Sequence, residues 1–203
     1  MFPSHDHAAI EMLTNRRLTL LDPNSWEDQN DLHIMGSYKR AKELKSLLAI
    51  CFTLTVEKSH FWKTFTNGDS GVSVRFNRET LLSRVPSSGQ FEHRTIEYMK
   101  LKDFRGLDES RVDDFPFIKR LPYKDEKEYR IIFTDKNRAL DFHYLKIDLN
   151  CIDRITLSPY LNNNLTTSLK QFLWSIDGCE ELEIYRSGSI RNQQWINKID
   201  SLS

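Results

Sequence analysis

The chain has 203 residues, of which 39% are hydrophobic and 29% are charged, and its formal net charge is zero. This composition excludes a disordered chain and gives no overall field that would draw the protein to nucleic acid or to an anionic membrane. Three cysteines without a CxxC pair do not support a disulfide framework or a structural zinc site. The N-terminus lacks a signal-peptide pattern and no apolar run could span a bilayer, so we expect a cytoplasmic location and no membrane partner.

The first half of the chain alternates short helices and strands. We expect a helix over 5–15, a strand over 17–21, a turn over 22–25 and a helix over 32–45. A tryptophan followed by acids and amides fills 26–31, which fits either an acidic helix start or a polar loop at the rim of a cleft. The most apolar stretch, 46–55, predicts a central strand buried on both faces. A helix over 60–66 capped by Ser59, a strand over 70–76 and a capped helix over 77–85 follow.

The second half of the chain contains more strands. We expect a strand with a bulge over 90–101, a charged segment over 102–120 that is helical and then irregular, and strands over 126–133, 142–147, 152–157 and 182–185. The clearest amphipathic helix spans 164–176, and a terminal helix that carries Trp195 spans 190–199. Helices and strands interleave irregularly, with frequent strand–turn–strand pairs. The sequence therefore predicts a single α+β domain over 1–203, with a mixed, mainly antiparallel sheet flanked by helices.

The most informative stretch is Glu126-Lys127-Glu128-Tyr129-Arg130, which opens a β-rich run. In a strand, a period of two would place Glu126, Glu128 and Arg130 on one face. Two carboxylates and a guanidinium on one face form either a salt-bridge ladder or a polar site that holds a ligand. The sequence predicts the place of such a site but names no reaction.

Common catalytic motifs are absent from the sequence. It contains no GxxxxGK[ST] phosphate loop, no GxGxxG after a strand, no HExxH and no GxSxG. With only seven glycines, a glycine-rich phosphate loop is not expected. These absences disfavour a classical nucleotide hydrolase or dehydrogenase.

Four blocks carry a resemblance to a known family. They are residues 18–28 with Leu-Asp-Pro and Trp26, residues 51–76 with Cys51-Phe52-Thr53 and Trp62, the Glu126–Arg130 stretch, and Arg154-Ile155-Thr156-Leu157-Ser158-Pro159 with the later Arg186-Ser187. Their order and spacing resemble a large bacterial and phage-associated family of uncharacterised domains, which has no agreed activity. The chain departs from that family in its 23–28 loop, and it lacks the aromatic or histidine-bearing strand that precedes the first helix.

More distantly, the chain is similar to the ADP-ribosyltransferase toxins. That likeness implies a transferase or glycohydrolase acting on NAD, in which a late glutamate stabilises the positive charge that develops on the ribose as nicotinamide leaves. The resemblance makes Glu128 the candidate for this anion and Glu126 its catalytic neighbour. It implies that Arg17 meets the pyrophosphate, that Trp62 or Phe65 stacks on nicotinamide, and that Arg130 also contacts the dinucleotide.

Two other functions stay open. Asp28, Asp31, Glu126 and Glu128 could gather a divalent ion in a metal-dependent nuclease, with Arg130 or Lys127 on the phosphate. Alternatively, the chain is a non-enzymatic binding or sensor domain in which the charged stretch is structural. The systems with which the resembling family is associated suggest a role in phage defence or a toxin system. The oligomeric state and the biological partner are left open.

Overall fold

The computed structural model describes residues 6–66 and 71–202. Within it the chain forms two compact units, unit 1 (Met1–Arg17, Val56–Arg84 and Lys146–Ser203) and unit 2 (Leu18–Thr55 and Val85–Leu145). Helices and strands mix throughout and the largest sheet is mainly antiparallel, so the predicted α+β class is confirmed. One domain over 1–203 stays a prediction. No helix in the described residues is long and apolar enough to cross a membrane.

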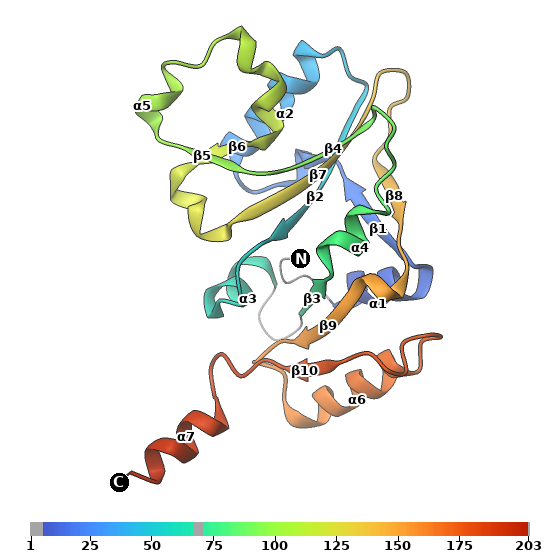
Figure 1. The fold of residues 1–203 in the computed structure, drawn as a ribbon, viewed down its shortest axis with the longest axis vertical. Coiled ribbons are helices and arrows are strands. Elements are labelled where there is room, and N and C mark those ends of the chain that lie inside the picture. The colour runs from blue at the N-terminus through green and yellow to red at the C-terminus, as the bar shows by residue number, and fades with distance from the viewer. Residues whose placement is uncertain (1–5, 67–70, 203) are drawn as a thin grey trace. The chain divides into compact units, whose positions relative to one another are not determined.

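Unit 2 is built on a five-stranded sheet (Figure 1). Its strand order is β4 (Phe91–Thr95), β7 (Glu128–Asp135), β2 (Ser46–Thr53), β1 (Arg17–Leu21) and β8 (Phe142–Lys146). The central strands β2 and β7 pair antiparallel over their full lengths, from Ser46 opposite Asp135 to Thr53 opposite Glu128. Both are predominantly buried, which confirms the predicted central strand at 46–55. Any polar side chain in the middle of either strand must therefore find its partners inside the protein.

Helix α2 (Gln29–Ala41) covers one face of this sheet. It begins after Asp28, whose side chain accepts a hydrogen bond from the Asn30 amide, so residues 26–31 lead into a helix start. The helix thus begins three residues before the predicted Leu32. Its buried Met35 and Tyr38 pack against Leu47, Ala49 and Ile132 from β2 and β7. On β7 the same face also carries Glu128 and Arg130, because they lie four and two residues before Ile132, respectively.

The chain between β4 and β7 differs from the prediction. The stretch 90–101 is two strands, because at Ile96 the chain leaves the large sheet and continues as β5 (Glu97–Met99). Strand β5 pairs in parallel with β6 (Ile118–Arg120) in a separate two-stranded sheet. Between them only α5 (Leu101–Phe104) is α-helical. The stretch Glu109–Phe117 is a 3-10 helix that contains Pro116, whose ring nitrogen has no proton to donate to an α-helical hydrogen bond.

The large sheet curls until aromatic side chains from its two edge strands meet. His143 on β8 stacks on Phe133 of β7, with ring centroids 4.0 Å apart and an interplanar angle of 4°. The same imidazole lies 5.5 Å from Phe91 on β4, at the opposite edge in strand order. The face of the sheet away from α2 therefore encloses its own aromatic core, and the α2 face is the one that carries charge.

Unit 1 contains a three-stranded sheet in the order β10 (Ile184–Arg186), β9 (Ile152–Leu157) and β3 (Val72–Phe76). Buried Val72 and Val74 on β3 share its core with Ile155 and Leu157 on β9. The helices of this unit are α1 (Asp6–Asn15), α3 (Ser59–Phe65), α4 (Arg78–Leu82), α6 (Asn163–Trp174) and α7 (Gln193–Asp200). These elements match the predicted order. His5 and Ser70, where a predicted helix and strand begin, lie outside the described residues.

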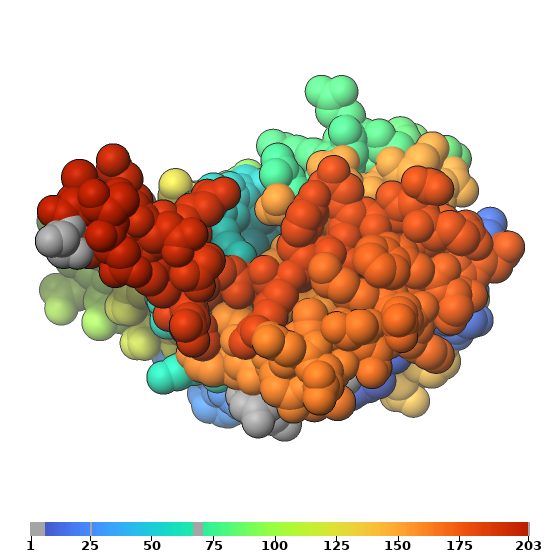
Figure 2. Space-filling view, turned by 90° about the horizontal axis from the view of Figure 1, so that it is seen from below, coloured from blue at the N-terminus to red at the C-terminus, as the bar shows by residue number. Residues whose placement is uncertain are grey.

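The two C-terminal helices bury less apolar surface than their patterns predict. In α6 only Leu173 and Thr166 are buried, and Leu165 and Phe172 of the predicted apolar face are exposed. No residue of α7 is buried, and Trp195 is 71% exposed. Within unit 1, α7 (deep red) stands apart from α6 (orange) in Figure 2. The amphipathic patterns identified both helices correctly, but a pattern does not guarantee a covered face.

We predict that Trp195→Ala changes the free energy of unfolding by less than about 0.5 kcal/mol, since the indole is solvent-exposed. Chemical denaturation measured by circular dichroism tests this. Trp62→Ala is the matched comparison, because that indole is fully buried, and its loss should cost about 3–5 kcal/mol. Equal losses in the two variants would show that α7 is packed.

We predict that the free energy of unfolding of unit 2 depends on pH through His143. Its pKa is lowered from the usual 6.5, first by burial and then by Arg138. The folded state therefore binds fewer protons than the unfolded chain, so this stabilisation is complete above pH 6.5 and is lost as the pH falls below it.

Urea unfolding from about pH 5 to 8 should show this slope, and His143→Gln should flatten it. The matched control is His33→Gln, at an exposed histidine of the same unit. An unchanged slope in the His143 variant would contradict the prediction.

Candidate functional site

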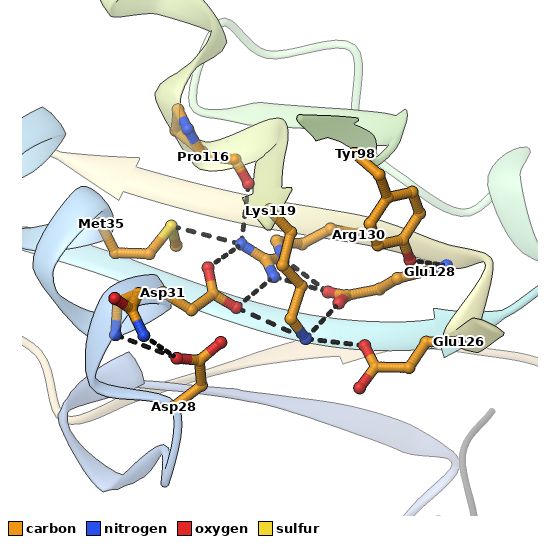
Figure 3. A network of polar contacts seen from close by, with 10 residues as sticks. Asp28, Asp31, Met35, Tyr98, Pro116, Lys119, Glu126, Glu128 and Arg130 are labelled. Carbon is orange, nitrogen blue, oxygen red and sulfur yellow. Dashed lines mark hydrogen bonds and ion pairs between the residues drawn. The ribbon is translucent and has the colours of Figure 1, made fainter. Parts of the chain in front are cut away.

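Five charged side chains meet on the α2 face of β7 (Figure 3). Two come from β7 itself, and the others come from the first turn of α2, from β6 and from the 3-10 turn that precedes β7. In chain order they are Asp31, Lys119, Glu126, Glu128 and Arg130, and we call them the charge network. All lie in unit 2. Their formal charges are three negative and two positive, so the network carries a net charge of −1.

Arg130 is the centre of the charge network. Its side chain is fully buried and donates hydrogen bonds to both carboxylate oxygens of Asp31. Nη1 lies 3.1 Å from Oδ1 and Nη2 lies 2.8 Å from Oδ2. Its Nε donates to Glu128 Oε1 at 2.8 Å, and Nη1 also donates to the Pro116 carbonyl at 2.8 Å. The guanidinium carbon lies 4.6 Å from the Trp26 ring centroid. Such a complete set of partners is what a buried guanidinium requires.

Lys119 neutralises the other side of the network. Its Nζ lies 2.7 Å from Glu126 Oε2, 3.1 Å from Glu128 Oε2 and 3.7 Å from Asp31 Oδ2. Glu128 is thus held by Arg130 through one oxygen and by Lys119 through the other. Its backbone N–H donates a hydrogen bond to the Tyr98 hydroxyl oxygen at 2.8 Å. Both oxygens of Glu128 are therefore occupied by cations.

The network shifts the pKa values of the two glutamates in opposite directions. Burial alone would raise the pKa of Glu128, but Arg130 and Lys119 outweigh it and lower that pKa to about 2. Burial raises the pKa of Glu126, and the hydrogen bond from Lys119 only partly offsets it. The pKa of Lys119 is raised, since Glu128 and Glu126 outweigh the burial that opposes its charge. Glu128 is held as an anion, and Glu126 is the easier of the two to protonate.

Cys51 lies directly opposite Arg130 in the pairing of β2 with β7. Burial, and then the nearby charge of Glu128, raise the pKa of its thiol well above the usual 9.0. The thiol therefore stays protonated at neutral pH, and its proximity helps to lower the pKa of Glu128. A protonated thiol is a poor nucleophile, so Cys51 supports the network and is not a candidate for covalent catalysis.

A cavity of about 640 Å³ lies beside the network, and we call it the α2 cavity. Asp31 and Lys119 belong both to the network and to the cavity wall, and Asp28, His33 and Arg120 add further polar groups. Its apolar lining comes from Ile34, Leu101, Phe104, Leu107, Phe115 and Ile118. A concave, mainly apolar space with a few polar groups on its wall is the usual form of a small-molecule site.

The structure brings together three of the predicted site residues, Glu126, Glu128 and Arg130. Glu126, however, does not share a strand face with the other two, as the sequence predicted. It ends the 3-10 turn Leu121–Glu126, and Lys127 follows in the left-handed region with φ of 44°. Strand β7 begins only at Glu128. Glu126 joins the network because it reaches Lys119, and not through a period of two.

The other predicted NAD-binding residues belong to unit 1. Arg17 donates through Nε to Glu11 at 2.7 Å. The Trp62 side chain is fully buried and donates to Glu57 at 2.7 Å, so neither ring face is open for stacking. Phe65 packs edge-to-face on Phe61, with centroids 5.6 Å apart. Each of these side chains therefore has a structural partner in unit 1.

The proposed metal ligands are also accounted for by other partners. Asp28 caps α2, while Asp31, Glu126 and Glu128 bind the two cations of the network. Among the residues that the structure describes, no group of three or more His, Cys, Asp or Glu is arranged to hold a metal ion. The sequence reading did not identify Lys119, the residue that joins these carboxylates. It lies in a three-residue strand, too short to produce a recognisable pattern.

Comparison with protein-family models, with curated proteins and with solved structures finds no match to this chain. The resemblance to the family of uncharacterised bacterial domains, and the more distant one to ADP-ribosyltransferase toxins, thus stay predictions.

We predict that Arg130→Met lowers the free energy of unfolding by about 3–5 kcal/mol, because it leaves Asp31 and Glu128 buried without their main cation. Methionine is also unbranched and apolar, so packing is approximately kept. Urea titration at neutral pH measures the loss.

The control for this prediction is Arg105→Met, at an exposed arginine of unit 2, which should change stability by less than about 0.5 kcal/mol. A loss of similar size in both variants would mean that the network contributes no more than an arginine at the surface.

Proposed function

We propose that the chain is a non-enzymatic binding or sensor domain that takes up a small molecule in the α2 cavity. The observation that carries this proposal is the internal neutralisation of Glu128. Arg130 and Lys119 hold its two oxygens, and its side chain is only 1% exposed. A carboxylate that must stabilise positive charge on a substrate needs a free oxygen facing that substrate. Glu128 presents none, whereas the α2 cavity beside it offers about 640 Å³ of space.

The charge network gives the α2 cavity a wall of fixed geometry. Asp31 and Lys119 line the cavity, and both are tied into the network by ion pairs with buried partners. Side chains that are already ordered lose little conformational entropy when a ligand binds. This arrangement supports binding with selectivity, which is what a sensor domain requires.

An NAD-consuming transferase or glycohydrolase is the second candidate, and one observation favours it. The pKa of Glu128 is lowered and that of Glu126 is raised, which is the division that a fixed anion and a proton-carrying neighbour need. Both glutamates bind the same ammonium group of Lys119, however, and that shared ion pair would have to open before either could act on a ribose.

Nicotinamide release from NAD by the purified wild-type chain separates the two candidates. The binding-domain proposal predicts no release above the rate in buffer. It also predicts that Glu128→Gln lowers the melting temperature, since Arg130 and Lys119 lose the charge that they share. Release that disappears in Glu128→Gln while the melting temperature is kept would overturn the proposal in favour of the enzyme. Glu126→Gln, at a less buried position, provides a second variant in case Glu128→Gln fails to fold.

Uptake by the α2 cavity is tested with 1-anilinonaphthalene-8-sulfonate, an apolar anion that fluoresces when it leaves water. We predict saturable fluorescence that falls about fivefold or more in Leu107→Trp, where the larger side chain fills the cavity. The matched control is Leu54→Trp, at an exposed leucine of unit 2 that does not line the cavity, and it should bind as the wild type does. Equal binding by all three proteins would reject the cavity as the ligand site.

A further inference from the structure

Two residues that line the α2 cavity, Arg120 and Asp28, each carry a buried polar atom, Nε and Oδ2, that has no hydrogen-bond partner among the described residues. Buried polar atoms normally find a partner, and leaving one without costs free energy. A polar group of a bound ligand, like an ordered water molecule, can supply such a partner. Two such side chains in one cavity lining, a cationic donor and an anionic acceptor, indicate which polar groups the ligand carries.

Arg120 is positioned to bind an anionic group. It ends β6, where it lies opposite Met99 of β5. Its neighbour Lys119 is committed to the charge network, but among the described residues no carboxylate forms an ion pair with Arg120. A guanidinium that lines a cavity and has a spare N–H binds a carboxylate with a charge-assisted hydrogen bond.

Asp28 is positioned to bind a cationic or donor group. Its Oδ1 accepts from the Asn30 amide at 3.0 Å and from Asn30 Nδ2 at 2.9 Å. These bonds lower the pKa of Asp28 against the burial that would raise it, so the group is charged at neutral pH. The Tyr123 hydroxyl adds to this lowering, but within the part of the chain that the structure describes Oδ2 has no partner at hydrogen-bond geometry.

The other side chains that line the cavity are apolar and favour a ligand with an apolar body. Phe104, Leu107, Phe115 and Ile118 present carbon surface, and Leu101 of α5 is 72% exposed. An exposed leucine beside an apolar cavity gains free energy when an apolar ligand covers it. The cavity volume of about 640 Å³ exceeds what a single amino acid side chain needs and suits a ligand of one or a few residues.

We propose that the α2 cavity binds a zwitterion with an apolar body, namely a hydrophobic amino acid or a short apolar peptide. Its carboxylate pairs with Arg120, its ammonium pairs with Asp28, and its side chains lie on the apolar lining. A purely anionic ligand would leave Asp28 unpartnered, and a purely cationic one would leave Arg120 unpartnered. The inference rests on the proposed function and specifies its substrate class.

Isothermal titration calorimetry on the full chain tests this class with four probes. These are L-phenylalanine, the dipeptide Leu-Phe, phenethylamine, which lacks the carboxylate, and 3-phenylpropanoate, which lacks the ammonium. We expect a zwitterionic probe to bind about tenfold or more tightly than either single-charge analogue, because each charge contributes a charge-assisted hydrogen bond.

Two variants assign the two ends of the ligand. Arg120→Gln should remove the preference for a carboxylate, so that L-phenylalanine binds no better than phenethylamine. Asp28→Asn should remove the preference for an ammonium, and asparagine can still cap α2. The control is Arg105→Gln, an exposed arginine of the same unit that does not line the cavity, and it should bind as the wild type does.

The outcomes separate this inference from the function on which it rests. If 3-phenylpropanoate binds as tightly as L-phenylalanine and Asp28→Asn has no effect, the ligand class is wrong and the cavity is an anion site. If no charged probe binds but 1-anilinonaphthalene-8-sulfonate binding is still lost in Leu107→Trp, the zwitterion is rejected and the binding domain stands. If neither the four probes nor the dye distinguishes Leu107→Trp from wild type, both proposals fail.

Discussion

The ion pair between Arg130 and Asp31 is the constraint on which unit 2 depends. A guanidinium in the middle of a central strand is removed from water, so every donor must be satisfied by the protein around it. Three segments supply those acceptors: α2 through Asp31, β7 through Glu128, and the 3-10 stretch before β6 through the Pro116 carbonyl. Met35 of α2 adds a weaker contact. If the helix or the 3-10 stretch were placed so that these acceptors did not reach the guanidinium, the buried charge of Arg130 would be left unpaired. We infer that Arg130 selects this arrangement more than it adds net stability.

The charges of the network also explain why the function proposed is binding and not catalysis. Three carboxylates alone could not be buried together, and Lys119 with Arg130 brings the balance to one net negative charge. Neutralisation on this scale holds side chains in place and leaves them without free oxygens. A wall of that kind is useful beside a cavity, because a ligand meets groups that are already oriented. In the lining of the α2 cavity, the buried atoms without a partner among the described residues belong to Asp28 and Arg120, outside the network, and that is where recognition is expected.

The sequence predicted the elements whose patterns are long and failed where contacts are distant in the chain. Strands β2 and β7 were found because each carries a continuous apolar or β-branched run, and the alternation of Glu128 with Arg130 was correctly placed on one face. Glu126 was placed wrongly, because no local sequence pattern predicts the left-handed backbone conformation of Lys127, which separates Glu126 from the strand. Asp31, Lys119 and Arg130 come together across long separations, which periodicity does not reveal.

The two sides of the α2 cavity are held by different forces. On the inner side, Asp31 and Lys119 are fixed by buried ion pairs, and Ile118 is buried in the core. On the outer side, α5 buries no residue, and the nearby ion pairs of Arg111 with Glu97 and Asp114 lie at the surface, although Phe115 and Phe117 further along pack against the core. Such pairs contribute little and weaken with salt, so local opening costs less free energy there than in the sheet. A ligand can therefore enter past α5 while the charge network keeps its geometry.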